Sequence, residues 1–184
     1  MLRGLTRWFG WLVVVALAWG SFGGQAFAQK PPDSTQTVTV TATVNTTFTL
    51  TLDASTITLT GDPGDTKTQA RIATVKSNFT AGPPWQLQIK KDQDLTDSTQ
   101  TPSQTIASAQ FTHTSTGGAG THDDTSDTTF PTAAALTTYY IATGAEKTNL
   151  PGGTAITSTY KLVIPANQAA GAYSNVITHT LISP

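Results

Sequence analysis

The three histidines are the side chains of this chain best suited to metal binding or proton transfer. They are His113, His122 and His179. No two of them stand at the short spacing of the known zinc signatures, so the sequence predicts no metal site. His113 and His179 alternate with apolar neighbours, and we expect both side chains to project from strand faces into solvent.

Two groups of acidic residues could supply oxygen ligands to a calcium ion. The first group follows His122 and the second lies upstream; together they comprise Asp123, Asp124, Asp127, Asp92, Asp94 and Asp97. Neither group has the glycine at the sixth position or the closing glutamate of a twelve-residue calcium loop. We favour the interpretation that these acids keep surface loops soluble, and the sequence leaves calcium binding open.

No set of residues for acid–base or nucleophilic catalysis is recognisable. Glu146 is the only glutamate and lies in a turn-like segment, whereas glycoside hydrolysis needs two facing carboxyl groups. The chain has no cysteine, no G-x-S-x-G motif and no glycine-rich phosphate loop after a strand. We therefore predict a protein that is not an enzyme and that needs no cofactor.

Aromatic residues are the remaining candidates for a binding site, because an exposed ring can stack on a sugar. Trp85 shares its parity with Leu87 and Ile89, which predicts a core position. Neighbouring residues of a strand face opposite ways, so one ring of the pair Tyr139 and Tyr140 should be exposed. That ring, with Phe130 or Phe79 from nearby loops, is the predicted contact surface for a glycan or another wall polymer.

An export signal precedes these residues. Residues 1–28 have Arg3 and Arg7, then an apolar run too short to span a bilayer, then the cleavage pattern Ala26-Phe27-Ala28. We expect a secreted or surface-exposed protein, in the periplasm or outside the cell, that has no membrane segment after cleavage. Residues 29–36 should form a flexible leader.

The composition of the remaining chain excludes several partners. It holds eight basic and eleven acidic residues, which gives no basic surface for nucleic acid or for anionic lipid. Threonine, with 38 of the 184 residues, takes over the polar role. Because threonine is β-branched and uncharged, this composition favours an extracellular β protein.

The elements that must carry these side chains are short β-strands. Between Thr37 and Thr60 apolar residues alternate with threonine, which predicts a first strand over 37–44, a second over 48–52 and, after a change of parity, a third around Ile57 and Leu59. Further strands are predicted over 70–76, 85–90, 106–114, 136–142, 160–164 and 173–182, with a long polar loop over 115–129. About eight or nine strands predict one antiparallel β-sandwich domain over residues 37–184.

The C-terminal segment carries a resemblance to known proteins. Residues 160–181, YKLVIPANQAAGAYSNVITHTL, are similar to the last two strands of secreted bacterial sandwiches of the spore coat protein U and fimbrial subunit kind. The segment from Ser77 to Ile89 is similar to the middle of WxL-type wall-associated domains. The resemblance implies an immunoglobulin-like sandwich outside the cell, in a fibre, coat or wall layer. The chain departs from it in having no cysteine and no Trp-x-Leu motif near the end.

These observations predict a non-enzymatic structural or adhesive surface protein. One mechanism is β-strand addition, in which the leader and the first strand pair with an exposed sheet edge of another subunit. The alternative is that this strand pairs within its own domain. A second hypothesis is a binding module for glycan or cell wall.

Overall fold

The computed structural model describes residues 36–131 and 135–183. The predicted signal peptide, 1–28, and all but the last residue of the predicted leader, 29–36, lie outside the described residues. The chain divides into two units, residues 1–42 and residues 43–184, and the strands all belong to the second unit.

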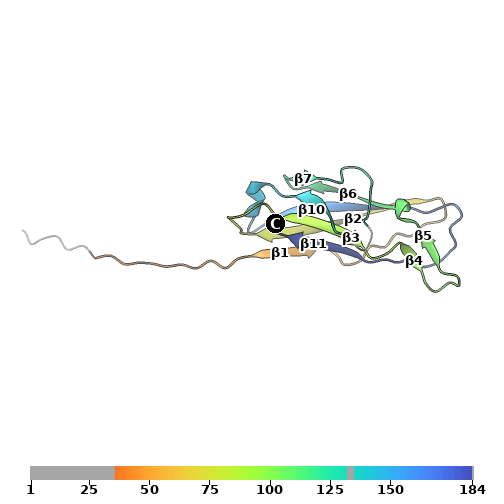
Figure 1. Ribbon diagram of the computed structural model, residues 1–184, viewed down its shortest axis with the longest axis horizontal. Coiled ribbons are helices and arrows are strands. Elements are labelled where there is room, and N and C mark those ends of the chain that lie inside the picture. Colours follow the sequence, from red (N-terminus) through yellow and green to blue (C-terminus); the bar gives the residue numbers. More distant parts are fainter. Residues whose placement is uncertain (1–35, 132–134, 184) are drawn as a thin grey trace, which may run out of the picture. The chain divides into compact units, whose positions relative to one another are not determined.

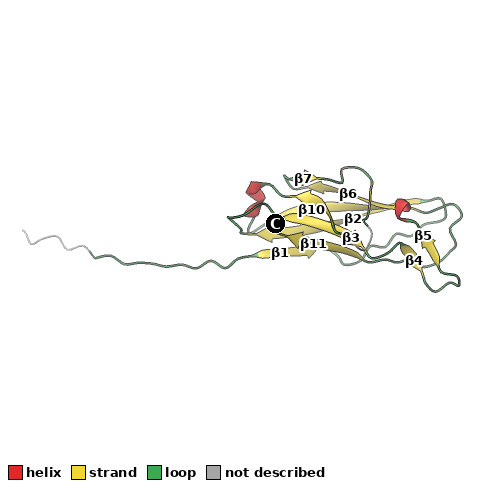
Figure 2. Ribbon diagram, viewed as in Figure 1, coloured by secondary structure: helices red, strands yellow, loops and turns green. Residues whose placement is uncertain are grey.

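The second unit is an all-β sandwich, as the alternation predicts (Figures 1 and 2). In spatial order, the first sheet comprises β1 (Phe48–Leu52), β2 (Thr66–Ser77), β10 (Thr154–Val163), β6 (Phe111–Gly117) and β8 (Thr128–Thr129). The second comprises β11 (Ile177–Ile182), β3 (Gln86–Lys91), β9 (Thr137–Ile141) and β7 (Thr121–His122). A small hairpin joins β4 (Leu95–Asp97) to β5 (Gln104–Ile106), and two 3-10 turns span Ser108–Gln110 (η1) and Gly144–Lys147 (η2). All pairings are antiparallel, and the immunoglobulin-like classification stays a prediction.

Alternating apolar side chains of both sheets form the core. On β10 the even-numbered positions face inward, and Ile156, Tyr160 and Leu162 are all buried. From the opposite sheet, Leu87 and Ile89 are fully buried, together with Trp85 just before β3. The predicted core position of Trp85 is therefore confirmed.

Two of the predicted strands are wrong within the described residues. Residues 36–47 contain no strand, and neither does the segment around Ile57 and Leu59. The reason is common to both: alternation indicates which side chains face inward, but a strand also needs a neighbour that accepts its backbone hydrogen bonds. The strand predicted over 106–114 is confirmed in part, because Ile106 ends β5, η1 interrupts the segment, and β6 begins at Phe111.

The predicted polar loop over 115–129 is also more ordered than expected. Its first residues extend β6 to Gly117, and it contributes β7 and β8, one to each sheet. Asp124 in this segment is 2% exposed, so the segment is not a purely solvent-facing loop.

One lateral side of the sandwich is incompletely covered. The outer strands here are β1 in the first sheet and β11 in the second. β1 pairs only with the stretch from Ala73 to Ser77, so the first half of β2 has its strand partner only in β10. In the part of the chain that the structure describes, no helix is long and apolar enough to cross a membrane.

Candidate functional site

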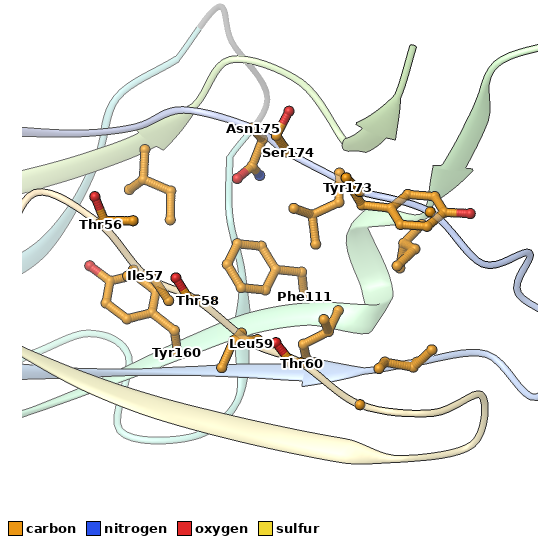
Figure 3. Close-up of a pocket in the computed structure, with 18 of the residues that line it drawn as sticks. Thr56, Ile57, Thr58, Leu59, Thr60, Phe111, Tyr160, Tyr173, Ser174 and Asn175 are labelled. Atoms are coloured by element: carbon orange, nitrogen blue, oxygen red, sulfur yellow. The ribbon is translucent and has the colours of Figure 1, made fainter. Parts of the chain in front are cut away.

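A groove of about 860 Å³ opens along this incompletely covered side. Its two walls are residues 52–63, which follow and include the end of β1, and residues 168–177, which lead into β11. Figure 3 shows the ring of Phe111 between these walls and the ring of Tyr160 beside Ile57. Phe111 and Tyr160 are only 4% and 2% exposed, so the groove borders the apolar core without opening it to solvent.

The first wall is extended, but it is attached to β2 through side chains. Thr58 donates its backbone N–H to Oε1 of Gln69 at 2.9 Å, and Arg71 donates from Nε to the carbonyl oxygen of Thr56 at 3.0 Å. Ile57 and Leu59 are half-buried against the core, and their threonine neighbours are exposed. Side chains between the two backbones replace the ladder that a strand pair would have, which explains why this wall is not a strand.

The second wall is held by a tyrosine. The Tyr173 hydroxyl donates to the backbone oxygen of Ala169 at 2.8 Å and accepts from Nε2 of Gln168 at 2.7 Å. Ser174 exchanges two backbone hydrogen bonds of 3.1 Å with Thr96 of the small hairpin. These bonds fix residues 168–177 away from the first wall and so keep the groove open.

The groove has little charge. Asp62 is the only acidic residue among its lining residues, and Arg71 is the only lysine or arginine. Its floor is supplied by apolar and aromatic side chains of β6, β10 and the residue after β10, among them Phe111, Leu162 and Ile164. Such a surface favours an uncharged, elongated and largely apolar occupant.

His179 lies at the inner side of the groove, where both of its ring nitrogens are hydrogen-bonded. Nδ1 is 3.0 Å from the Tyr139 hydroxyl and Nε2 is 2.7 Å from the Tyr160 hydroxyl. Burial, with the nearby His113, lowers the pKa of His179 to about 4, so the ring is neutral at neutral pH. The expectation that His179 projects into solvent is wrong, because its ring bridges two core tyrosines.

His113 is also buried rather than solvent-facing, and it pairs with an aspartate. Its Nδ1 lies 2.7 Å from Oδ2 of Asp124, and both side chains are 2% exposed. Burial opposes ionisation of Asp124, but hydrogen bonds from His113 and Ser115 outweigh it and lower the pKa of that carboxyl group. The pairing spans eleven residues of sequence, so no local pattern announced it.

A serine, a histidine and an aspartate meet at this pair, but in an order that does not suit nucleophilic catalysis. Ser115 bonds to Oδ1 of Asp124 and lies 2.6 Å from Nδ1 of His122. A catalytic triad places the histidine between the other two and leaves the serine accessible. Here the serine is in the middle and is 3% exposed. This cluster joins β6 to the 117–129 segment.

A serine and a lysine also meet, at the C-terminal end of β3. Lys91 is 2% exposed, and its Nζ contacts Ser108 and lies 2.5 Å from Oδ1 of Asp94. The hydrogen bond from Lys91 lowers the pKa of Asp94, which therefore stays ionised. The lysine is thus engaged with both Asp94 and Ser108.

The acidic residues singled out for calcium are mostly used as hydrogen-bond acceptors. Asp97 accepts from the Thr99 backbone at 2.9 Å and from Gln100 at 2.9 Å, and Asp92 accepts from the Val176 backbone at 2.8 Å. Within the described residues, no group of three or more His, Cys, Asp or Glu side chains is placed to hold a metal ion.

The aromatic residues named as contact candidates do not form an exposed platform. Tyr139, Tyr140 and Phe130 are 1%, 0% and 3% exposed. Phe79 is half-buried and packs edge-on against Phe48, with ring centroids 5.0 Å apart. The expectation of one exposed ring in the Tyr139–Tyr140 pair is wrong. The segment 117–122 covers the Tyr140 ring, and Gly120 in this segment donates its N–H to the Tyr140 hydroxyl at 2.9 Å.

Glu146 has a structural role that its turn-like sequence context concealed. Its carboxylate accepts hydrogen bonds from the Tyr140 hydroxyl at 2.7 Å, from the Ala119 N–H at 2.9 Å and from the Thr143 N–H at 2.8 Å. Burial opposes ionisation, but the hydrogen bonds outweigh it and the pKa of Glu146 is lowered. Its backbone oxygen also accepts the indole N–H of Trp85 at 3.0 Å.

Comparison with protein-family models, with curated proteins and with solved structures finds no match for this chain. The groove and the buried clusters must therefore be interpreted from their own geometry.

Proposed function

We propose that this protein is a non-enzymatic structural subunit of an extracellular fibre, coat or surface layer, in which copies join by β-strand addition. The observation that supports this proposal is the open groove beside two strands with free lateral edges, in a chain that also carries an unpaired alternating segment. Export through the predicted signal, 1–28, is part of the same proposal.

The first wall of the groove is long enough to accompany an extended peptide. It contributes about ten residues, and an extended chain of that number spans about 33 Å. A strand between the walls could pair with β11 on one side, because β11 has its strand partner only in β3. Its inward side chains would cover the apolar floor and complete the core.

The segment 37–44 has the properties of the occupant. It has the sequence TVTVTATV, without a charge, and the structure assigns it no strand. Val38, Val40 and Val44 would share one face of an extended strand. They are 86%, 85% and 82% exposed, which is unusual for three apolar side chains on one face. Eight extended residues span about 26 Å, so the segment fits within the length of the first wall.

The energetics make a second copy a sufficient partner. Burying the three valines contributes roughly 5 kcal/mol, and each backbone hydrogen bond to β11 adds about 1 kcal/mol. Association costs on the order of 4–15 kcal/mol, so the valines and the hydrogen-bond ladder are both needed for stable joining. The threonines at the odd positions would face outward, where their hydroxyl groups meet water.

The hypothesis of a glycan-binding module is less well supported. Its predicted contact residues Tyr139, Tyr140 and Phe130 are buried, and Phe79 is engaged with Phe48. No observation among the described residues favours it over strand addition.

The parity of the segment provides a matched test. The chain lacking residues 1–28 is examined by size-exclusion chromatography and negative-stain microscopy, beside a variant with Val38→Asp and Val40→Asp and a control with Thr39→Asp and Thr41→Asp. Both variants add the same charge two residues apart. We expect the unmodified chain and the threonine control to form assemblies and the valine variant to stay monomeric.

Two results would contradict the proposal. One is an unmodified chain that stays monomeric over the whole accessible concentration range. The other is equal behaviour of the valine and threonine variants, because only the valines are proposed to enter the groove.

A further inference from the structure

The amide of Asn78 holds the chain at the point where the segment 37–44 meets the sandwich. Oδ1 of Asn78 accepts the Thr47 N–H at 2.7 Å, and Nδ2 donates to the Asn45 carbonyl oxygen at 2.8 Å. The Asn78 backbone N–H also donates to the Thr47 carbonyl oxygen at 3.2 Å. One residue thus satisfies three backbone groups just before β1. The pairing of β1 with β2 begins at the next residue, where Phe48 is paired with Ser77.

Asn78 is itself fixed from the other side. Asn149 accepts the Ser77 N–H on Oδ1 at 2.7 Å and donates its own N–H to the Ser77 carbonyl oxygen at 3.0 Å. Asn78 also forms an isolated bridge with Thr148. Next to it, Phe79 packs edge-on against Phe48. We call Asn78 with its bonds to Asn45 and Thr47 the Asn78 clamp. Because the backbone around Asn78 is itself hydrogen-bonded, Asn78 has little freedom to follow a movement of residues 45–47.

The position of this clamp determines how much free chain separates the proposed donor segment from its own sandwich. The clamped residues begin at Asn45, and Val44, 82% exposed, is the last residue of the alternating segment. No unbonded linker lies between them. A linker's length and composition set how freely two connected bodies reorient, so a linker of no residues gives a stiff connection.

We propose that Asn78 is a positioning residue that stiffens the joint between consecutive subunits. This inference rests on the proposed strand addition: with residues 37–44 of one copy seated in the groove of the next, the Asn78 clamp is the first fixed point of the donor's own sandwich. Removing the amide releases the Thr47 N–H and the Asn45 carbonyl oxygen, leaves only the backbone bond from Asn78 to the Thr47 carbonyl oxygen, and so loosens the joint at residues 45–46.

The test measures stiffness separately from assembly. Assemblies of the chain lacking residues 1–28 are compared with those of Asn78→Ala and of Asn167→Ala, an exposed asparagine outside the clamp. We expect Asn78→Ala to shorten the persistence length of the assemblies by at least about twofold, and Asn167→Ala to leave it unchanged. In the same samples, hydrogen exchange of the Thr47 amide should become at least about tenfold faster in Asn78→Ala.

A second variant separates the clamp from a general loss of stability. Asn78→Asp keeps an acceptor for the Thr47 N–H but has no donor for the Asn45 carbonyl oxygen, so its persistence length should lie between those of the other two chains. It also decides the matter if Asn78→Ala does not fold.

The outcomes are distinguishable. An unmodified chain that does not assemble contradicts the proposed function itself. Assemblies of unmodified chain and Asn78→Ala with equal persistence length overturn the inference alone. A folded Asn78→Ala chain that no longer assembles overturns it too, because a stiffening role requires that joints still form without the clamp.

Discussion

The Tyr160 phenol oxygen and Nε2 of His179 lie 2.7 Å apart, and this hydrogen bond joins the two sheets directly beside the groove. Tyr160 belongs to β10 in the centre of the first sheet, and His179 belongs to the edge strand β11 of the second. With Tyr139 on the other ring nitrogen, the histidine holds the edge strand against the core without a charge. Burial raises the pKa of both tyrosines, so both phenols stay protonated.

The lowered pKa of His179 predicts that acid weakens the fold. Its folded value of about 4 lies below the unfolded value of about 6.5, so the unfolded chain binds more protons between these values. The contribution of His179 to the free energy of unfolding is fully present above about pH 6.5. It is lost as the pH drops towards about 4, by an amount on the order of 3 kcal/mol. Urea unfolding at several pH values should show a smaller loss for His179→Gln than for the unmodified chain; parallel losses would contradict the assignment.

Glu146 is predicted to be important for stability because the buried Tyr140 hydroxyl and two backbone N–H groups depend on its carboxylate. Glu146→Ala leaves the Tyr140 hydroxyl and the N–H groups of Ala119 and Thr143 without their acceptor, which should cost about 3 kcal/mol in unfolding free energy. Glu146→Gln keeps one acceptor oxygen and should cost less. Denaturant unfolding of both variants checks this order, and an alanine variant as stable as the glutamine variant would show that the carboxylate is dispensable.

The Lys91–Asp94 pair predicts an asymmetry between its two halves. Asp94→Ala leaves a buried ammonium group with only Ser108, whereas Lys91→Met removes the charge and leaves an exposed aspartate. We expect Asp94→Ala to lower the unfolding free energy by about 2 kcal/mol, with a smaller effect of Lys91→Met. The double variant should resemble Lys91→Met. If Lys91→Met is the more damaging change, the packing of the lysine stem matters more than its charge.

The absence of cysteine allows a direct test of where residues 37–44 bind. Val40→Cys in one copy and Ile57→Cys in a second, tagged copy are mixed under mild oxidation. A mixed disulfide dimer of distinct gel mobility is expected, because Ile57 lines the groove. Thr39→Cys, of the opposite parity, should give much less of it. A double variant that closes the disulfide only within one chain would instead place the segment in its own groove.

Much of the sandwich was predictable because its strands follow a period of two. The pattern placed Trp85, Leu87 and Ile89 in the core and located parts of β2, β3, β9, β10 and β11. These features depend on residues close together in sequence, so local patterns were sufficient.

The buried polar clusters were not predictable in this way. His113 is buried because it pairs with Asp124, and the half-buried His179 is held by two tyrosines from β9 and β10. A polar side chain can enter a core only where a partner compensates its lost hydration, and these partners lie on other strands. A single sequence contains no local signal for that compensation.

The sequence by itself determined that this chain is a threonine-rich all-β protein with an apolar face on alternate residues, because side-chain direction follows directly from strand geometry. Only the tertiary structure decided which alternating segments find a partner. It pairs 48–52 with β2, leaves 36–47 without a strand, and opens a groove beside residues 52–63. The physical reason is that a strand is completed by the backbone of a neighbour, and the neighbour's position is a property of the whole fold.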